Sequence, residues 1–199
     1  AGSVRAPMKT TDYSPYVQRI KDAKPDAVFV FMAAGETPSI FLRQFKEAGA
    51  DQTIKIIGTG DITDEPNLPA AGDAAIGVVT AFHYTPTHDS ALNKEFAANF
   101  AAAAPGKSLS FVGAATYDAL HVIYEVIEKQ KGDINPDKTM ELIKQIKFES
   151  PRGPIEIDPA TRDIVQNIYI RKVEKVDGER YNVEFATFEA VKDSGKTKK

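Results

Sequence analysis

The sequence contains no cysteine, and this absence excludes several classes of protein at once. Without thiols the chain has no disulfide framework, no thiolate zinc site and no cysteine nucleophile. Long apolar runs are also missing, because the longest one begins at Ala27 and stops before Glu36. A membrane-spanning helix needs about 18 consecutive apolar residues, so the sequence predicts none. Residues 1–11 lack the apolar segment of a signal peptide, which leaves the compartment undecided.

Basic charge is scarce as well. The chain has 25 Lys and Arg against 28 Asp and Glu, a formal net charge of −3. A nucleic-acid groove requires a concentrated basic face, so no nucleic-acid partner is predicted. The basic cluster at residues 195–199 is typical of a solvated tail. What the chain does have, 42% hydrophobic and 27% charged residues over 199 positions, is typical of a globular protein with one large domain or two small ones.

The first 84 residues alternate predicted strands and helices. Residues 27–32 (AVFVFM) form a continuous apolar run with β-branched and aromatic character, which favours a strand buried on both faces. The order β–α–β–α–β with short loops predicts an α/β fold with a parallel sheet covered by helices. The predicted elements are an edge strand at 3–8, a helix from the Thr11-Asp12 cap to Ala23, strand 27–32, a helix from Thr37-Pro38 to Gly49, strand 54–57, a short helix at 68–71 and strand 76–82.

The pattern changes after His83 and Tyr84. Three helices are predicted at residues 91–104, 110–131 and 136–146, with no strand between them. Residues 150–154 are predicted to form a loop. Residues 164–173 and 182–188 alternate apolar and polar side chains around a turn, which favours an antiparallel hairpin.

Asp61 is the first candidate for a functional residue, because it follows the predicted strand 54–57. In open α/β sheets, ligands bind in the crevice at the carboxyl ends of the strands. A carboxylate there binds an ammonium or a hydroxyl group. The alternative is that Asp61 only caps the next helix, as Asp often does.

Residues 33–36 (Ala-Ala-Gly-Glu) take the same place after the preceding strand. Small side chains let a ligand approach the backbone, and the start of a helix offers free N–H groups. The alternative, an ordinary turn from strand to helix, is favoured by the residues alone.

Signatures of cofactors and catalysis are missing. Gly58 and Gly60 resemble the start of a dinucleotide fingerprint, but Thr63 stands where the third glycine belongs. His83 and His88 flank a flexible connector, a spacing that argues against a metal site. No set of nucleophile, base and orienting group can be assembled, so neither an enzyme nor a cofactor is predicted.

Several motifs in one order resemble a known family. DYSPYVQRIKDAKPDAVFVFMAAGE, IKIIGTGDITDE, GDAAIGVVTAFHY, YDALHVIYEVI and FESPRGPIEIDPATRDIVQNIYIRKVEKVDG are similar to type I periplasmic binding proteins. More closely, they resemble the branched-chain amino-acid (leucine-type) substrate-binding component of ABC transporters. The resemblance runs from Val4 to Phe188 and identifies the family, but not a ligand.

The resemblance implies two Rossmann-like lobes that close around a small ligand. Residues 1–84 and 167–199 would belong to the second lobe, and residues 85–166 would form a helical segment of the first. Because the family is about twice this length, the chain resembles a C-terminal half, and a free half would leave strand edges and apolar faces open to self-association.

The resemblance also implies a ligand site. Asp61 stands one position away from a glutamate that grips the ligand's ammonium in the leucine-type pattern, and no tyrosine stands at the turn of residues 33–35. Phe111 matches an aromatic residue of the first lobe that packs on the ligand. The ligand-binding positions that follow are Thr59, Gly60, Asp61, Ala34, Gly35, Tyr84 and Phe111.

The function that the resemblance implies is the solute-binding component of an ABC importer, exported to the periplasm and partnered by a membrane permease. The expected ligand is a branched or hydrophobic amino acid, with amides and small aromatic acids as further options. The alternatives are a sensory or regulatory module on the same fold, or a truncated remnant that binds nothing.

Overall fold

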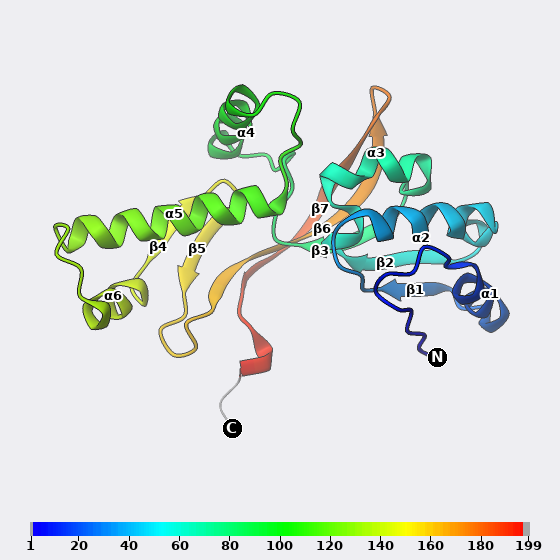
Figure 1. The fold of residues 1–199 in the computed structure, drawn as a ribbon, viewed down its shortest axis with the longest axis horizontal. Coiled ribbons are helices and arrows are strands. Elements are labelled where there is room, and N and C mark those ends of the chain that lie inside the picture. Colours follow the sequence, from blue (N-terminus) through cyan, green and yellow to red (C-terminus); the bar gives the residue numbers. More distant parts are fainter. Residues whose placement is uncertain (1, 197–199) are drawn as a thin grey trace. The chain divides into compact units, whose positions relative to one another are not determined.

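The computed structural model describes residues 2–196 and divides into two compact units (Figure 1). Unit 1 runs to Phe82 and adds Ile170–Ala186, and unit 2 comprises His83–Tyr169 and the residues from Thr187 on. The chain therefore passes between units three times, whereas the sequence placed the changes after residues 84 and 166. The last three residues of the predicted basic tail lie outside the described part.

Unit 1 is an α/β unit built on parallel strands. β1 pairs with β2 in parallel, with Ala27 opposite Lys55 and Val30 opposite Gly58, and β2 pairs with β3 in the same sense. This is the parallel sheet that the alternation of elements predicts. Its elements are α1 (Ser14–Ala23), β1 (Ala27–Val30), α2 (Glu36–Glu47), η1 (Ala50–Gln52), β2 (Lys55–Thr59), η2 (Gly60–Thr63), η3 (Glu65–Asn67), α3 (Leu68–Ala71), η4 (Gly72–Ala74) and β3 (Val79–Phe82).

Helices cover one face of this sheet. Phe41 of α2 packs edge-on against Tyr13 with 5.6 Å between ring centroids, and both belong to the buried cluster that includes Val30 of β1. On the alternate positions Phe29 and Phe31 remain 68% and 75% exposed. The prediction that strand 27–32 is buried on both faces is therefore wrong, because within residues 2–196 no element covers the second face.

Local details of unit 1 also depart from the predictions. Residues 3–8 form no strand. Helix α2 begins at Glu36 rather than Thr37, with Gly35 as its N-cap residue. Strand β3 begins at Val79 rather than Ile76, because Gly77 turns the chain at a φ of 85°.

Unit 2 contains two strands that the sequence did not predict, one on either side of the turn within the predicted loop 150–154. β4 and β5 pair antiparallel, with Ser150 opposite Gly153 across a tight turn. Gly153 has a φ of 94°, and a Cβ there would lie 2.6 Å from the Tyr169 hydroxyl oxygen, so the turn requires glycine. The elements are α4 (Ala91–Ala103), α5 (Phe111–Lys129), α6 (Pro136–Ile143), β4 (Lys147–Ser150) and β5 (Gly153–Ile157).

Two long strands continue through both units and form the predicted hairpin. β6 (Ile164–Val176) and β7 (Glu179–Val191) pair along their length as a ribbon (Figure 1). β6 adjoins β3 in unit 1 and β5 in unit 2, which gives the strand order β1-β2-β3-β6-β5-β4. Both strands are longer than their apolar alternation predicts.

Among residues 2–196, no helix combines the length and the apolar character that crossing a bilayer would require.

A buried ion pair joins α5 to the β4–β5 turn in unit 2. Asp118 of α5, 5% exposed, accepts hydrogen bonds of 2.6 Å from both the Ser150 hydroxyl and Arg152 Nε. Arg152 also donates from Nη1 to Gln166 Oε1 at 2.7 Å. The pair therefore fixes the helix against the β4–β5 turn and β6.

We expect Asp118→Ala to lower the free energy of unfolding by about 3–5 kcal/mol, because it leaves the Arg152 charge buried without its partner. Denaturant unfolding followed by circular dichroism measures this change. The control is Asp89→Ala, which breaks the exposed Lys94–Asp89 pair and should cause no measurable loss. Equal losses for the two variants would contradict the prediction.

Candidate functional site

The candidate site lies at the carboxyl ends of β1 and β2 in unit 1. The two strands end side by side, because Val30 is in register with Gly58. After β2 the chain enters η2, which contacts α2. We call residues 59–65 the Asp61 loop. The Asp61 loop therefore lies at the same edge of the sheet as the turn before α2, which contains Ala34 and Gly35.

Asp61 is partly exposed on this loop. Neither η2 nor η3 has a hydrogen bond from a capping side chain, so the alternative in which Asp61 caps the next helix has no support. Within residues 2–196 no protein donor is hydrogen-bonded to the Asp61 carboxylate. A carboxylate with open acceptor positions at a strand end is suited to receive N–H or O–H donors, and its role with a ligand stays a prediction.

Gly60 is buried directly before Asp61 and has no room for a side chain. A Cβ at this position would overlap the Phe82 ring and lie 2.5 Å from Arg171 Nη2. The glycine therefore permits close packing of the loop on β3 and β6. The hydroxyl of Thr59 is buried and has no hydrogen-bond partner among the described residues.

The turn before α2 has little side-chain bulk. Ala34 is exposed, and Gly35 has a φ of 134° and a ψ of −155°, a conformation that favours glycine. No atom would lie within 4 Å of a Cβ built on Gly35, so the backbone is open to approach.

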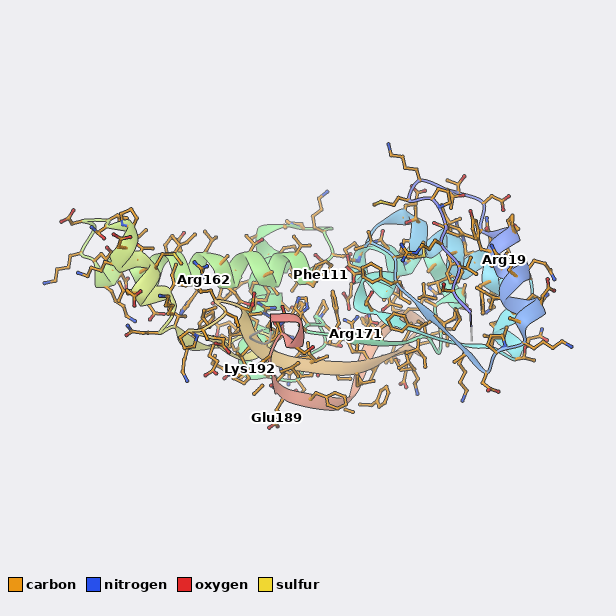
Figure 2. The ribbon with its side chains drawn as sticks, turned by 90° about the horizontal axis from the view of Figure 1, so that it is seen from below. Arg19, Phe111, Arg162, Arg171, Glu189 and Lys192 are labelled. Carbon is orange, nitrogen blue, oxygen red and sulfur yellow. The ribbon has the colours of Figure 1, made fainter. Side chains whose placement is uncertain are left out.

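Phe111 and Tyr84 belong to unit 2. Phe111 begins α5 (labelled in Figure 2), is partly buried and packs edge-on against His83, with ring centroids 5.8 Å apart. Tyr84 is fully buried, and its hydroxyl donates to Asn93 Oδ1 at 2.9 Å. The Tyr84 side chain is thus engaged within the unit, and its role with a ligand stays a prediction.

A buried polar network beneath the Asp61 loop was missed by the sequence analysis. Asn182 of β7, 1% exposed, donates from Nδ2 to the Thr63 carbonyl at 2.7 Å and to Glu65 Oε1 at 2.8 Å. It also accepts a 2.8 Å hydrogen bond from the Thr63 hydroxyl. A single amide therefore holds the loop through both its backbone and its side chains.

Arg171 of β6 supplies the cation of this network. Its side chain is fully buried, and it donates to the Thr80 hydroxyl from Nη2 at 3.2 Å and from Nε at 3.4 Å. The same Nη2 lies 3.5 Å from the Gly60 carbonyl, and Nη1 lies 3.7 Å from Glu65 Oε1. The guanidinium also stacks over the Phe82 ring at 5.1 Å. The sequence holds one signal for Arg171. Tyr169, Arg171 and Val173 are alternate residues of β6 and all lie on its buried face, where a charged side chain is unexpected.

Asp64 carries an unusual carboxyl group in the same loop. Burial, followed by the negative charge of Glu65, raises the pKa of Asp64 from 3.8 to about 6, and Asp61 adds to the rise while Arg171 opposes it. Asp64 is 7% exposed, and its Oδ1 has no hydrogen-bond partner among the described residues. Its ionisation therefore occurs inside the candidate site.

Comparisons with known proteins assign a family. The family model described as "Periplasmic binding protein" matches residues 1–179. "Leu/Ile/Val-binding protein homolog 6" of Brucella abortus is 43% identical over 97% of this chain and 50% of its own length. The chain thus spans about half the length of the curated relatives it matches.

Solved structures of related proteins contain aromatic acids. A solute-binding protein of an ABC transporter from Rhodopseudomonas palustris BisB5, in complex with 3,4-dihydroxybenzoic acid, is 54% identical, covering 94% of this chain and 51% of that one, with a TM-score of 0.87. A second, from Rhodopseudomonas palustris HaA2 in complex with p-hydroxybenzoic acid, is 40% identical, covering 98% and 54%, with a TM-score of 0.92. Both likenesses confirm the expected fold.

Replacing Asp64 by Asn should change how stability depends on pH. Because the folded-state pKa of Asp64 is raised, the contribution of Asp64 to wild-type stability decreases as the pH rises from about 3.8 to about 6 and is level above that window. Asp64→Asn has no such titration, so its stability relative to wild type should rise across the window by at most about 3 kcal/mol.

Melting temperatures of both proteins between pH 4.5 and 7.5 measure this difference. The control is Asp51→Ala, an exposed substitution before β2, which should run parallel to wild type. A difference between Asp64→Asn and wild type that stays constant with pH would contradict the prediction.

Proposed function

The chain belongs to the periplasmic binding protein family, and from this premise we propose that it is the C-terminal half of an ABC-importer solute-binding protein for hydroxylated aromatic acids. The proposal includes an exported, periplasmic protein that closes two lobes around its ligand and delivers it to a membrane permease. No catalytic step belongs to this function.

One observation carries the proposed ligand class. The relative bound to 3,4-dihydroxybenzoic acid is 54% identical over 94% of this chain, a higher identity than the 43% of the relatives named for leucine, isoleucine and valine. The 40% identical relative also holds a hydroxylated benzoic acid. These ligands support a ring with at least one hydroxyl group and one carboxylate.

Asp61 fits such a ligand through its acceptor oxygens. A ring hydroxyl donates one hydrogen bond, and a carboxylate is a strong acceptor for it. In this proposal the Asp61 carboxylate accepts a hydrogen bond from the ring hydroxyl instead of binding an ammonium group. Thr59 and Gly60, with the backbone at Ala34 and Gly35, would line the site around it.

Phe111 is proposed to supply apolar contact to the ring. It lies at the start of α5, where the side chain is only partly buried. An aromatic ring packs favourably on another aromatic side chain in an edge-on or offset geometry.

A second candidate ligand is a branched-chain amino acid. The Brucella relatives are named for such ligands and cover 97% of this chain. In that case Asp61 would bind the ammonium group. The two candidates differ in the ligand group that contacts Asp61, and this difference makes them separable by mutation.

We expect Asp61→Ala to weaken binding of 4-hydroxybenzoate by about tenfold to a hundredfold, the loss expected for a hydrogen bond to a charged group. Binding of benzoate, which lacks the hydroxyl, should stay the same. Isothermal titration calorimetry would measure both ligands and leucine on the 199-residue chain and on a chimera that adds the other half of the 54% identical relative.

The matched control is Asp51→Ala, because Asp51 precedes β2 whereas Asp61 follows it. If leucine binds and 4-hydroxybenzoate does not, the amino-acid candidate replaces the aromatic one. If none of the three ligands binds to the chain or to the chimera, the proposed function is wrong. An equal loss of benzoate and 4-hydroxybenzoate would contradict the role of Asp61.

Self-association of the isolated chain is a further part of the proposal. β1 ends the order of strands, so its outer edge has no neighbour among residues 2–196. The uncovered sheet face beside it exposes Phe29, Phe31 and Ile57, the last by 44%. An open strand edge next to exposed aromatic side chains favours pairing with the same edge of a second copy.

Light scattering on the isolated chain should therefore give a mass above that of a monomer. The variant Phe29→Ser/Phe31→Ser removes the apolar rows and should shift the mass toward 21.7 kDa. Met8→Ser is the control, because Met8 is 86% exposed but lies outside this face. A monomeric wild type at every concentration would contradict the prediction.

A further inference from the structure

Arg171 carries a fully buried charge in unit 1. Its side chain is fully buried on β6 (labelled in Figure 2), and burial lowers the pKa of the guanidinium while Glu65 and Glu184 oppose that change. A buried cation loses hydration energy that an apolar side chain of similar size would not lose. Its presence therefore calls for a role beyond filling the core.

Arg171 contacts the Asp61 loop as well as β3. Two of its contacts, to the Gly60 carbonyl and the Glu65 carboxylate, lie on either side of Asp61 in the sequence. The Thr80 hydroxyl of β3 also accepts a hydrogen bond from this guanidinium and so fixes the position of the guanidinium on the sheet. The loop is thus fastened to the sheet at both of its ends.

The loop sequence accommodates this side chain. A Cβ on Gly60 would lie 2.5 Å from Arg171 Nη2, so the close approach depends on glycine. Asn182 of β7 donates to the same Glu65 oxygen that lies nearest Arg171 Nη1. Glu65 is therefore held from two strands, and with it the backbone that carries Asp61.

We propose that Arg171 is a positioning residue, which holds the Asp61 loop in the conformation that receives the ligand's hydrogen-bond donor. This inference rests on the proposed function, in which Asp61 contacts the ligand. Arg171 acts through the Gly60 carbonyl and the Glu65 carboxylate and does not itself touch the ligand.

Two variants separate positioning from stability. Arg171→Met removes the cation and leaves Glu65 without its partner charge, so it should lower the melting temperature. Arg171→Met/Glu65→Gln removes both charges, while the Gln side chain still accepts from Asn182, so stability should recover. Affinity for 4-hydroxybenzoate should remain about tenfold or more below wild type in both variants, because the Gly60 carbonyl next to Asp61 loses its contact with Arg171, whereas Asn182 holds the loop at Thr63 and residue 65.

Hydrogen exchange without ligand supplies an independent readout. The amides of residues 59–65 should exchange faster in the double variant than in wild type, while those of α2 stay protected. The control is Arg152→Met/Asp118→Asn, which removes a buried ion pair in unit 2 and should leave exchange at residues 59–65 unchanged.

The outcomes are distinguishable. If wild type binds none of the tested ligands, the proposed function fails, and exchange at residues 59–65 still decides whether Arg171 fastens the loop. If the double variant recovers affinity together with stability, Arg171 is only structural. Unchanged exchange at residues 59–65 in both Arg171 variants would overturn the inference.

Discussion

Unit 1 depends on one buried cation, the guanidinium of Arg171, and on the oxygens that compensate for its lost hydration. Thr80, Glu65 and the Gly60 carbonyl supply these oxygens from β3 and the loop after β2. This arrangement fastens the loop to the sheet, and together with the Phe82 ring it leaves no room for a side chain at position 60. Removing one partner of such a buried pair strongly destabilises a fold, because the other charge then stays buried without compensation.

The exposed apolar side chains of this chain are consistent with its length, which is about half that of the relatives it matches. Phe29 of β1 and Phe31 just after it alternate with the partly buried Val28 and the buried Val30, and they are exposed because no described element packs on them. On α5, the side chains of Val112, Leu120 and Ile123 are also 42–56% exposed. A chain that spans half of its relatives' length is expected to expose faces that a longer chain would cover.

Much of the fold was predictable because local signals were strong. The helix at residues 68–71 and the hairpin around residues 177–178 follow directly from their patterns. β4 and β5 were missed because strands of four and five residues around Gly153-Pro154 resemble a loop. Asp61 could be placed at the strand end from sequence, but Arg171 could not be assigned to its loop, since the two lie 110 positions apart and only the pairing of β6 with β3 brings them together. Whether the predicted site residues bind a ligand is a matter for the titrations.

The charges around the Asp61 loop constrain how a ligand would lie against it. One cation, Arg171, stands among the acids Asp61, Asp64, Glu65 and Glu184. Above a pH of about 6 Asp64 is also ionised, so the loop carries an excess of negative charge. Such a surface repels an anionic carboxylate and attracts hydrogen-bond donors. An aromatic acid at this site would therefore direct its hydroxyl edge toward Asp61, and its carboxylate would require donors from another part of the full-length protein.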